Sequence, residues 1–168
     1  DIAIKFNNAF GEVFKIPKFT VLPFSKVGSL SNGELKMSKS SPSQNDIIYL
    51  NDDMTAVSKK YKKATTDSFN GICPNGSIRS ESVENLISIL YSITGQTRME
   101  VCALYGDRGY GVFKKALIEA HEQFILPIKN EFDRISNADV DEILKKGSER
   151  AAEYAFNKMK EIKIAMGL

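Results

Sequence analysis

The sequence has 168 residues, of which 42% are hydrophobic and 26% are charged, and its formal net charge is +2. This composition is typical of a globular domain with a core, and the charge excludes neither a nucleic-acid partner nor a neutral one. No apolar run approaches the roughly 20 residues of a membrane-crossing helix, and no signal peptide is visible.

The first 50 residues combine a helical pattern, a short strand pattern and a polar loop. Apolar residues at helical spacing predict a helix over residues 1–15, which Pro17 ends. The segment Lys18–Pro23 predicts a strand. Residues 25–45 lose periodicity and are rich in Ser, Asn, Gly and Lys, which is typical of a functional or mobile loop. Ile47–Leu50 is a second apolar run, either a strand or a buried turn.

The next pattern predicts a basic amphipathic helix. Asp52 or Asp53 can cap it, and its apolar stripe lies opposite a lysine-rich face. These lysines are Lys59, Lys60, Lys62 and Lys63. Phosphate contacts from such a cluster would be sensitive to salt, but a solvated helix face without a partner is an equal alternative.

The remainder of the chain predicts helices almost throughout. Thr97 and Glu100 fit a capping box, and Asp139 and Glu142 fit another before the last helix. Pro127 lies inside a helical pattern, where we expect a kink or break. The last helix has the clearest apolar stripe, formed by Val140, Ile143, Leu144, Gly147, Ala151, Ala155, Met159, Ile162 and Met166.

The polar loop contains the pentapeptide Lys36-Met37-Ser38-Lys39-Ser40. Its two ammonium groups can reach different oxygens of a triphosphate, and the small serines allow main-chain N–H groups to approach. Mobile lysines that close on the charge of a departing pyrophosphate stabilise the transition state more than the ground state. The alternative is a solvated loop without a role, which a bare pair of lysines would favour.

This pentapeptide is identical to the KMSKS signature of class I aminoacyl-tRNA synthetases. Four further stretches, Ile47–Asp53, Ala64–Ser68, Gly109–Lys114 and the closing helix Val140–Leu168, resemble tryptophanyl-tRNA synthetases in the same order. The resemblance spans essentially the whole chain and corresponds to the carboxy-terminal half of that family. Because the chain starts with Asp1 rather than Met, within a predicted helix, we expect it to be a fragment.

The resemblance implies roles for the residues of the loop. Lys36 and Lys39 would bind and neutralise the ATP phosphates, and Lys39 would be the main stabiliser of the transition state. Met37 would contact the adenine side through its backbone. The other implied ATP contacts are two serines that shape the loop and an upstream position whose main chain meets adenine: Ser38, Ser40 and Val27.

The resemblance also implies that the helical part binds tRNA(Trp), with unstacked anticodon bases meeting side chains. The sequence does not identify the residues that read these bases. The basic candidates for tRNA contact are Lys59, Lys60, Lys62, Lys63, Arg98 and Arg108.

The active site implied by the family would be incomplete in this chain. Its one histidine, His121, lies on a late helix, so a His-x-Gly-His signature is absent and we assign His121 no catalytic role. We therefore expect the chain alone to be inactive. Tryptophan would be bound mainly by the amino-terminal half, and ATP would bring Mg²⁺ without a protein metal site. The parent would be a cytoplasmic, homodimeric tryptophan–tRNA ligase with reduced Cys73 and Cys102 and without membrane or DNA partners.

The predicted fold is mainly α. Residues 1–50 would be the tail end of a Rossmann-type α/β nucleotide-binding domain with a small piece of its sheet. Residues 51–168 would form a helical, anticodon-binding-type domain packed as a bundle. We expect residues 31–43 to be poorly ordered without ATP. We also expect exposure of the apolar residues that would cover the missing sheet: Ile2, Phe6, Phe10 and Phe14.

Two other interpretations remain open. The chain could be a stand-alone helical RNA-binding module that retains a synthetase-like loop. It could also be a helical interaction protein with an accidental KMSKS, which the ordered series of matching stretches disfavours. The open reading frame before Asp1 would distinguish the first of these from a synthetase fragment.

Overall fold

The computed structural model describes residues 1–21, 26–73 and 79–168. The chain divides into two compact units, one of residues 1–21 with 133–168 and the other of residues 22–132. In chain order the helical segments are α1 (Ile2–Phe10), the 3₁₀ segment η1 (Gln44–Asp46), α2 (Met54–Lys63), α3 (Glu81–Thr94), α4 (Arg98–Tyr105), α5 (Tyr110–Arg134) and α6 (Asn137–Met166). The predicted mainly helical fold is confirmed.

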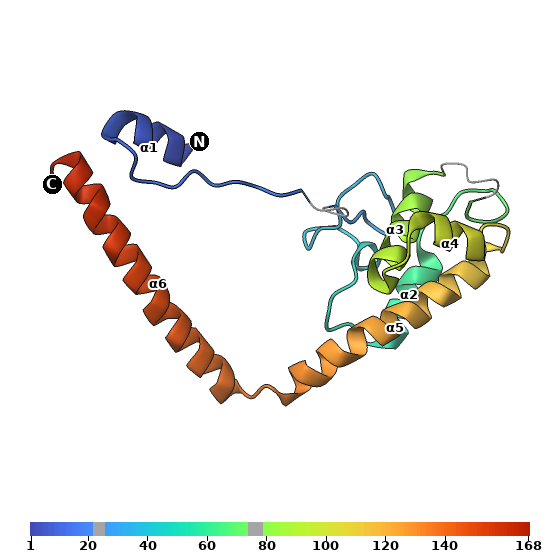
Figure 1. Cartoon of the computed structure of the whole chain (residues 1–168). Helices are drawn as coiled ribbons and strands as arrows, with labels where there is room; N and C mark the ends of the chain where they lie inside the picture. Colours follow the sequence, from blue (N-terminus) through green and yellow to red (C-terminus); the bar gives the residue numbers. More distant parts are fainter. Residues whose placement is uncertain (22–25, 74–78) are drawn as a thin grey trace. The chain divides into compact units, whose positions relative to one another are not determined.

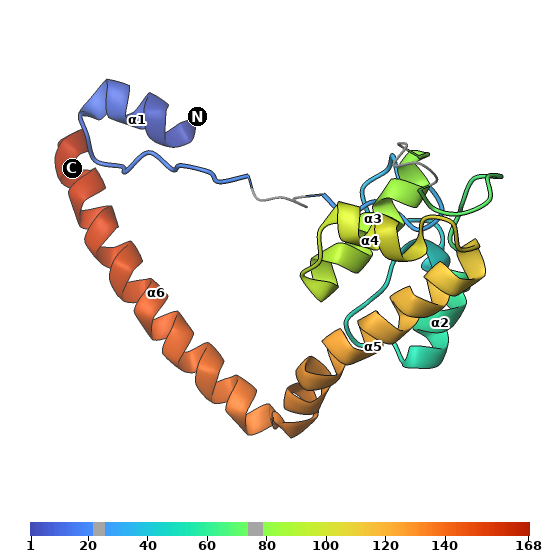
Figure 2. The same cartoon turned by 45° about the vertical axis from the view of Figure 1, so that its right-hand side comes forward.

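The larger unit has a continuous apolar core. Helices α2, α3, α4 and α5 lie together in both views (Figures 1 and 2). Tyr61 of α2, Leu86 of α3 and Phe113 of α5 are each at most 1% exposed and belong to one cluster. Burial of large side chains of this kind contributes about 1.5–3 kcal/mol each.

Local sequence signals explain where several of these helices begin. The Asp53 carboxylate accepts from the Ala56 amide at 2.8 Å and caps α2. The predicted capping box of Thr97 and Glu100 is present at α4. A second capping box opens α6, but it joins Ser136 to Asp139, so the predicted pair of Asp139 and Glu142 is wrong by three residues. Asp139 serves as the third residue of the helix rather than its cap.

Two predicted features of the backbone also differ from the structure, the first wholly and the second in part. Residues 18–21 form no strand, and the rest of the predicted strand lies outside the described residues. Among the described residues there is no sheet, and the one strand-like pairing is a bridge between Gly28 and Lys36. A strand requires a neighbour for its backbone groups, and residues 18–21 have none there. Of the kink or break predicted at Pro127, the break is absent, because α5 continues to Arg134.

The smaller unit is held by local contacts at its amino-terminal end. The ring of Phe6 lies 4.8 Å from that of Phe10 and 5.0 Å from that of Phe14. The Asn7 amide closes the turn after α1, donating to the Phe14 carbonyl at 2.7 Å. The Lys158 ammonium of α6 donates to the Val13 carbonyl at 3.0 Å.

This unit lacks a core. Neither α1 nor α6 contains a buried residue. The expected exposure of the amino-terminal apolar residues holds for Ile2 and Phe10, whereas Phe6 and Phe14 are half-buried against each other. By its contacts α6 belongs to the smaller unit, and the domain that was predicted to extend from residue 51 to the end stays a prediction.

Among the described residues, none of the helices combines the length and the apolar character that spanning a bilayer requires.

Candidate functional site

The lysine-rich loop begins with a hairpin-like arm formed by residues 26–37. Gly28 and Lys36 face each other in an antiparallel bridge. The Met37 amide donates to the Val27 carbonyl at 2.8 Å, and the Ser29 amide donates to the Leu35 carbonyl at 2.8 Å. The arm therefore fixes the backbone on which the first lysine of the pentapeptide is carried.

Helix α3 supports this arm through two polar side chains. The Asn85 amide oxygen accepts from the Gly28 N–H at 2.7 Å, and its NH₂ group donates to the Gly28 carbonyl at 2.9 Å. The Ser82 hydroxyl accepts from the Gly33 N–H at 3.1 Å. Sequence reasoning missed both side chains. A signal was available, because Asn85 is a polar residue among the apolar positions of α3.

The loop beyond the arm exposes its lysines and anchors its methionine. Lys36 and Lys39 are exposed, and no ion pair joins either of them to another described residue. Met37, between them, is half-buried and packs against the core. The Ser38 and Ser40 hydroxyls lie 2.9 Å apart, and the Ser40 amide donates to the Ser38 hydroxyl at 3.3 Å.

A buried carboxylate, that of Asp46, fixes the carboxyl-terminal end of the loop by hydrogen bonds. Asp46 is 8% exposed and accepts a short hydrogen bond from the Ser41 hydroxyl. Hydrogen bonds from Ser31 and from Ser41 hold the pKa of Asp46 below its ordinary value. The Leu30 amide donates to the Asp46 carbonyl at 3.0 Å. Asp46 thus connects both ends of the loop.

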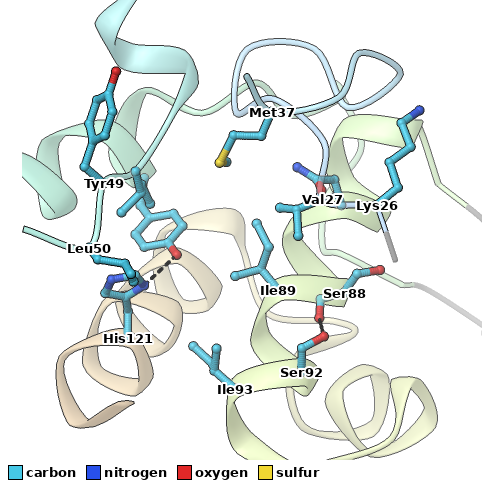
Figure 3. A pocket seen from close by; sticks show the side chains of 13 residues that line it. Lys26, Val27, Met37, Tyr49, Leu50, Ser88, Ile89, Ser92, Ile93 and His121 are labelled. Atoms are coloured by element: carbon cyan, nitrogen blue, oxygen red, sulfur yellow. Dashed lines mark hydrogen bonds between the residues drawn. The ribbon is translucent and has the colours of Figure 1, made fainter. Parts of the chain in front are cut away.

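A mainly apolar cavity of about 310 Å³ lies beside the arm (Figure 3). The side chains of Val27 and Met37 line it together with Ile89 of α3. Tyr61 and His121 also line it, and the Tyr61 hydroxyl lies 3.0 Å from the His121 Nδ1 atom. Burial lowers the pKa of His121, which favours the uncharged ring, and in that form the hydrogen bond with the Tyr61 hydroxyl can run in either direction, depending on the tautomer.

The predicted lysine cluster on α2 divides into two kinds of residue. Lys60 is 8% exposed, and its ammonium lies 2.5 Å from the Asp52 carboxylate and 5.3 Å from the centre of the Tyr49 ring. The other three are exposed: Lys59, Lys62 and Lys63. Only these three present charge to solvent.

The two predicted arginines also differ. The Arg98 guanidinium pairs with Glu84 at 2.9 Å and 2.5 Å. Burial alone would raise the pKa of Glu84, but hydrogen bonds from Arg98 and from the Arg79 amide hold it below its ordinary value. Arg108 is exposed. Arg98 therefore joins α4 to α3, whereas Arg108 is open to solvent.

Two further groups bear on possible chemistry. Burial, together with a hydrogen bond with Cys73, raises the pKa of the Cys102 thiol to about 12, so Cys102 is a poor nucleophile. Among the described residues, no group of three or more His, Cys, Asp or Glu side chains is arranged to hold a metal ion.

Comparison with known proteins gives a consistent result. Residues 1–125 match the family described as tRNA synthetases class I (W and Y). The chain is 37% identical to the tryptophan–tRNA ligase of Bacillus anthracis, covering 100% of this chain and 51% of that protein. It is 36% identical to the Bacillus subtilis enzyme with the same coverage.

Solved structures agree with the sequence relatives. The tryptophanyl-tRNA synthetase of Mycoplasma pneumoniae matches with a TM-score of 0.86 at 28% identity, over 99% of this chain and 52% of that one. The Campylobacter jejuni synthetase, solved with ADP and tryptophan, matches with a TM-score of 0.64 at 26% identity, over 99% of this chain and 51% of that one.

The chain belongs to the class I tRNA synthetases for tryptophan and tyrosine. Within that family, the resemblance to tryptophanyl-tRNA synthetases is confirmed, because tryptophan–tRNA ligases match the chain from end to end. The chain spans about half the length of these relatives.

Proposed function

We propose that this chain supplies the ATP-phosphate loop and a tRNA-binding helical surface to a tryptophan–tRNA ligase. The reaction would be activation of tryptophan by ATP to tryptophanyl-adenylate, followed by transfer to tRNA(Trp). Residues 1–50 would act with the catalytic domain and residues 51–168 with the tRNA. The tryptophan pocket would lie in the half of the relatives that this chain does not match, so the chain alone would be inactive.

The observation that carries the proposal is the arrangement of Lys36 and Lys39. Both ammonium groups are exposed and without an ion pair among the described residues, yet the backbone before them is fixed by the arm. Lysines of this kind can close on a triphosphate and then release pyrophosphate. In this role Lys39 would stabilise the charge of the leaving group, and the serine hydroxyls and amides would position phosphate oxygens.

The adenine would lie against the backbone at Val27 and Met37. In the described structure the Met37 amide donates to the Val27 carbonyl at 2.8 Å, so these groups are already paired with each other. Adenine binding there would use the remaining backbone groups or exchange this bond.

Mg²⁺ would accompany the ATP phosphates rather than occupy a protein site. The carboxylate nearest in sequence to the loop's carboxyl end, Asp46, is committed to Ser31 and Ser41. We therefore assign Mg²⁺ to the ATP phosphates, with the two loop lysines as the cations that the protein would supply.

Three exposed lysines of α2 support the tRNA-binding part of the proposal, together with Arg108. Phosphate contacts require charges that are open to solvent. Lys60 and Arg98 are weaker candidates, because each is already paired with a carboxylate. The parent would work as a homodimer in the cytoplasm.

The proposal is tested by tryptophan-dependent ATP–pyrophosphate exchange in the full-length protein. Lys39→Ala is expected to lower kcat roughly 100-fold or more, because a transition-state contact is lost. Lys145→Ala, which removes an exposed lysine of α6, is the matched control. Unchanged exchange in Lys39→Ala would disprove the assigned role of the loop.

The tRNA surface is tested separately by filter binding of tRNA(Trp) at low and moderate salt. Joint replacement of Lys59, Lys62 and Lys63 by Ala is expected to weaken binding and to flatten its salt dependence. Lys60→Met should leave the salt dependence unchanged, because this lysine is buried. Equal salt slopes in all variants would remove this surface from the proposal.

A further inference from the structure

A side chain of helix α3, Asn85, hydrogen-bonds to both the N–H and the carbonyl group of one residue of the arm, Gly28. Asn85, which is 9% exposed, accepts from the Gly28 N–H and donates to the Gly28 carbonyl, with a longer contact of 3.4 Å to the Ser29 carbonyl. A buried amide in an apolar helix face is costly unless its polar atoms are all paired. Here one side chain satisfies two backbone groups that lie 57 residues away in sequence.

The backbone is too closely packed for a side chain at Gly28, where the arm folds against itself, and at Gly33, where it meets the first turn of α3. A Cβ atom at Gly28 would lie 2.5 Å from the Gly33 carbonyl oxygen, and one at Gly33 would lie 2.3 Å from the Glu81 carbonyl oxygen. Both glycines therefore let backbone meet backbone. The hydroxyl of Ser82, one turn before Asn85, accepts a hydrogen bond from the Gly33 amide. The helix therefore hydrogen-bonds to the arm at two separate points.

The backbone pairing around Gly28 connects these contacts with helix α3 to the lysine loop. Gly28 faces Lys36, and its neighbours Val27 and Ser29 pair with Met37 and Leu35. A displacement of Gly28 would therefore displace the backbone that carries Lys36. No other side chain of the described residues is shown to bond to both polar groups of Gly28.

The geometry points to Asn85 as a positioning residue that couples helix α3 to the ATP-phosphate loop. This inference rests on the proposed function of the loop. Asn85 touches no reacting atom, but it sets where the adenine-side backbone and the first lysine stand before ATP arrives. Because tryptophan would bind elsewhere, loss of Asn85 should weaken the use of ATP far more than the use of tryptophan.

The first test uses amide hydrogen exchange in the 168-residue chain to measure how strongly the Asn85 hydrogen bonds hold the arm in place. Asn85→Leu keeps the approximate volume and removes both hydrogen bonds, leaving the Gly28 groups unpaired. Exchange of amides in residues 26–37 is expected to rise roughly tenfold or more, while peptides from α4 and α5 keep their protection. An unchanged arm, or an equal rise throughout the larger unit, would overturn the inference.

Two further variants separate positioning from general stability. Asn85→Asp keeps the acceptor for the Gly28 N–H but places an anion against the Gly28 carbonyl, so it should loosen the arm to a similar degree. Ile87→Val shortens a fully buried side chain of the same helix that makes no polar contact with the arm. It should lower the melting temperature without selective exchange in residues 26–37.

The second test uses pyrophosphate exchange in the full-length protein. Asn85→Leu is expected to raise KM for ATP roughly tenfold while KM for tryptophan changes less than about twofold. Equal changes in both constants, or none, would contradict a positioning role. If Lys39→Ala were also without effect, the proposed function would have failed; if Lys39→Ala abolished exchange while Asn85→Leu did not alter KM for ATP, only this inference would have failed.

Discussion

Helices α3 and α6 have comparable apolar stripes in the sequence but opposite surroundings in the structure. In α3 the residues Val83, Leu86, Ile87 and Leu90 are at most 1% exposed. In α6 no residue is buried, and Ile143 and Leu144 are each 65% exposed. A stripe of apolar residues at helical spacing therefore predicts a helix and the face that would be covered, but it does not predict that anything in the same chain covers it.

The difference has an energetic consequence. The larger unit derives its stability from the burial of side chains on four helices, which is proportional to the apolar area removed from water. Helix α6 depends on its capping box, on the left-handed Gly167 at its end and on local ion pairs such as Lys146 with Glu142. Exposed pairs of this kind contribute only about 0.3–0.5 kcal/mol each.

The largest expected effect compares two phenylalanines. Phe113 of α5 is fully buried, whereas Phe156 of α6 is 72% exposed. Phe113→Ala is expected to lower the free energy of unfolding by about 3–5 kcal/mol. Phe156→Ala should change it by less than about 0.5 kcal/mol. Urea denaturation followed by circular dichroism measures both, and similar losses would show that the comparison is wrong.

Two neighbouring lysines of α2 provide a second contrast. Lys60 is paired with Asp52 away from solvent, and Lys59 is exposed. Lys60→Met leaves the Asp52 carboxylate without its cation and should cost about 1.5–3 kcal/mol. Lys59→Met should cost less than about 0.5 kcal/mol. If both variants unfold at the same urea concentration, the buried ion pair is not stabilising the core.

The dependence of stability on pH sharpens the comparison further. His121 is the one histidine of the chain, and its pKa is lowered by burial, partly opposed by the charge of Asp52. The unfolded chain therefore binds this proton more readily than the folded chain. The contribution of neutral, buried His121 to the free energy of unfolding is fully present above the ordinary histidine pKa of about 6.5. It is lost as the pH falls from that value toward the lower pKa that His121 has in the folded chain.

The measurement is the free energy of unfolding between pH 7.5 and 5.5. His121→Gln is expected to remove most of the pH dependence in this range, because His121 is the one histidine of the chain and histidine is the side-chain type whose ordinary pKa lies between pH 5 and 8. Persistence of the same slope in this variant would assign the effect to another group.

The smallest expected effects come from the two capping boxes. Thr97→Ala removes the cap of α4 in the larger unit and should cost about 1 kcal/mol of global stability. Ser136→Ala removes the equivalent cap of α6. Since α6 buries no residue, this change should act as local fraying, measured as faster amide exchange in the first turn of α6. Loss of global stability greater than that of Thr97→Ala would be inconsistent with an exposed helix.

Short sequence signals predicted part of the fold well. The mainly helical fold and the capping box of Thr97 and Glu100 follow from local patterns, although the helix predicted over residues 1–15 ends at Phe10. The strand over Lys18–Pro23 failed where it is described, because strand formation depends on a partner that local sequence cannot specify. The cap of α6 was misplaced because Ser136 and Glu142 both offer plausible partners for Asp139.

The buried polar residues of the larger unit could not be predicted with the same ease. Lys60 is three positions after Val57 and so lies on the apolar face of α2, which was a usable signal of burial. Asn85 offered only its unusual polarity on α3, since its partner Gly28 is 57 residues away. Long-range hydrogen bonds of this kind become visible only when the backbone path is known.

The two glycines of the arm also set limits for anyone who redesigns this protein. Positions 31, 32 and 34 face solvent; positions 32 and 34 should tolerate many replacements or a reporter group, whereas the Ser31 side chain hydrogen-bonds to Asp46 and should be kept. Positions 28 and 33 have no space for even a methyl group, since each would collide with a carbonyl oxygen. A library that varies the turn while keeping these two positions and Ser31 fixed should yield folded variants, whereas one that randomises all five should yield mostly molecules with a dislodged loop.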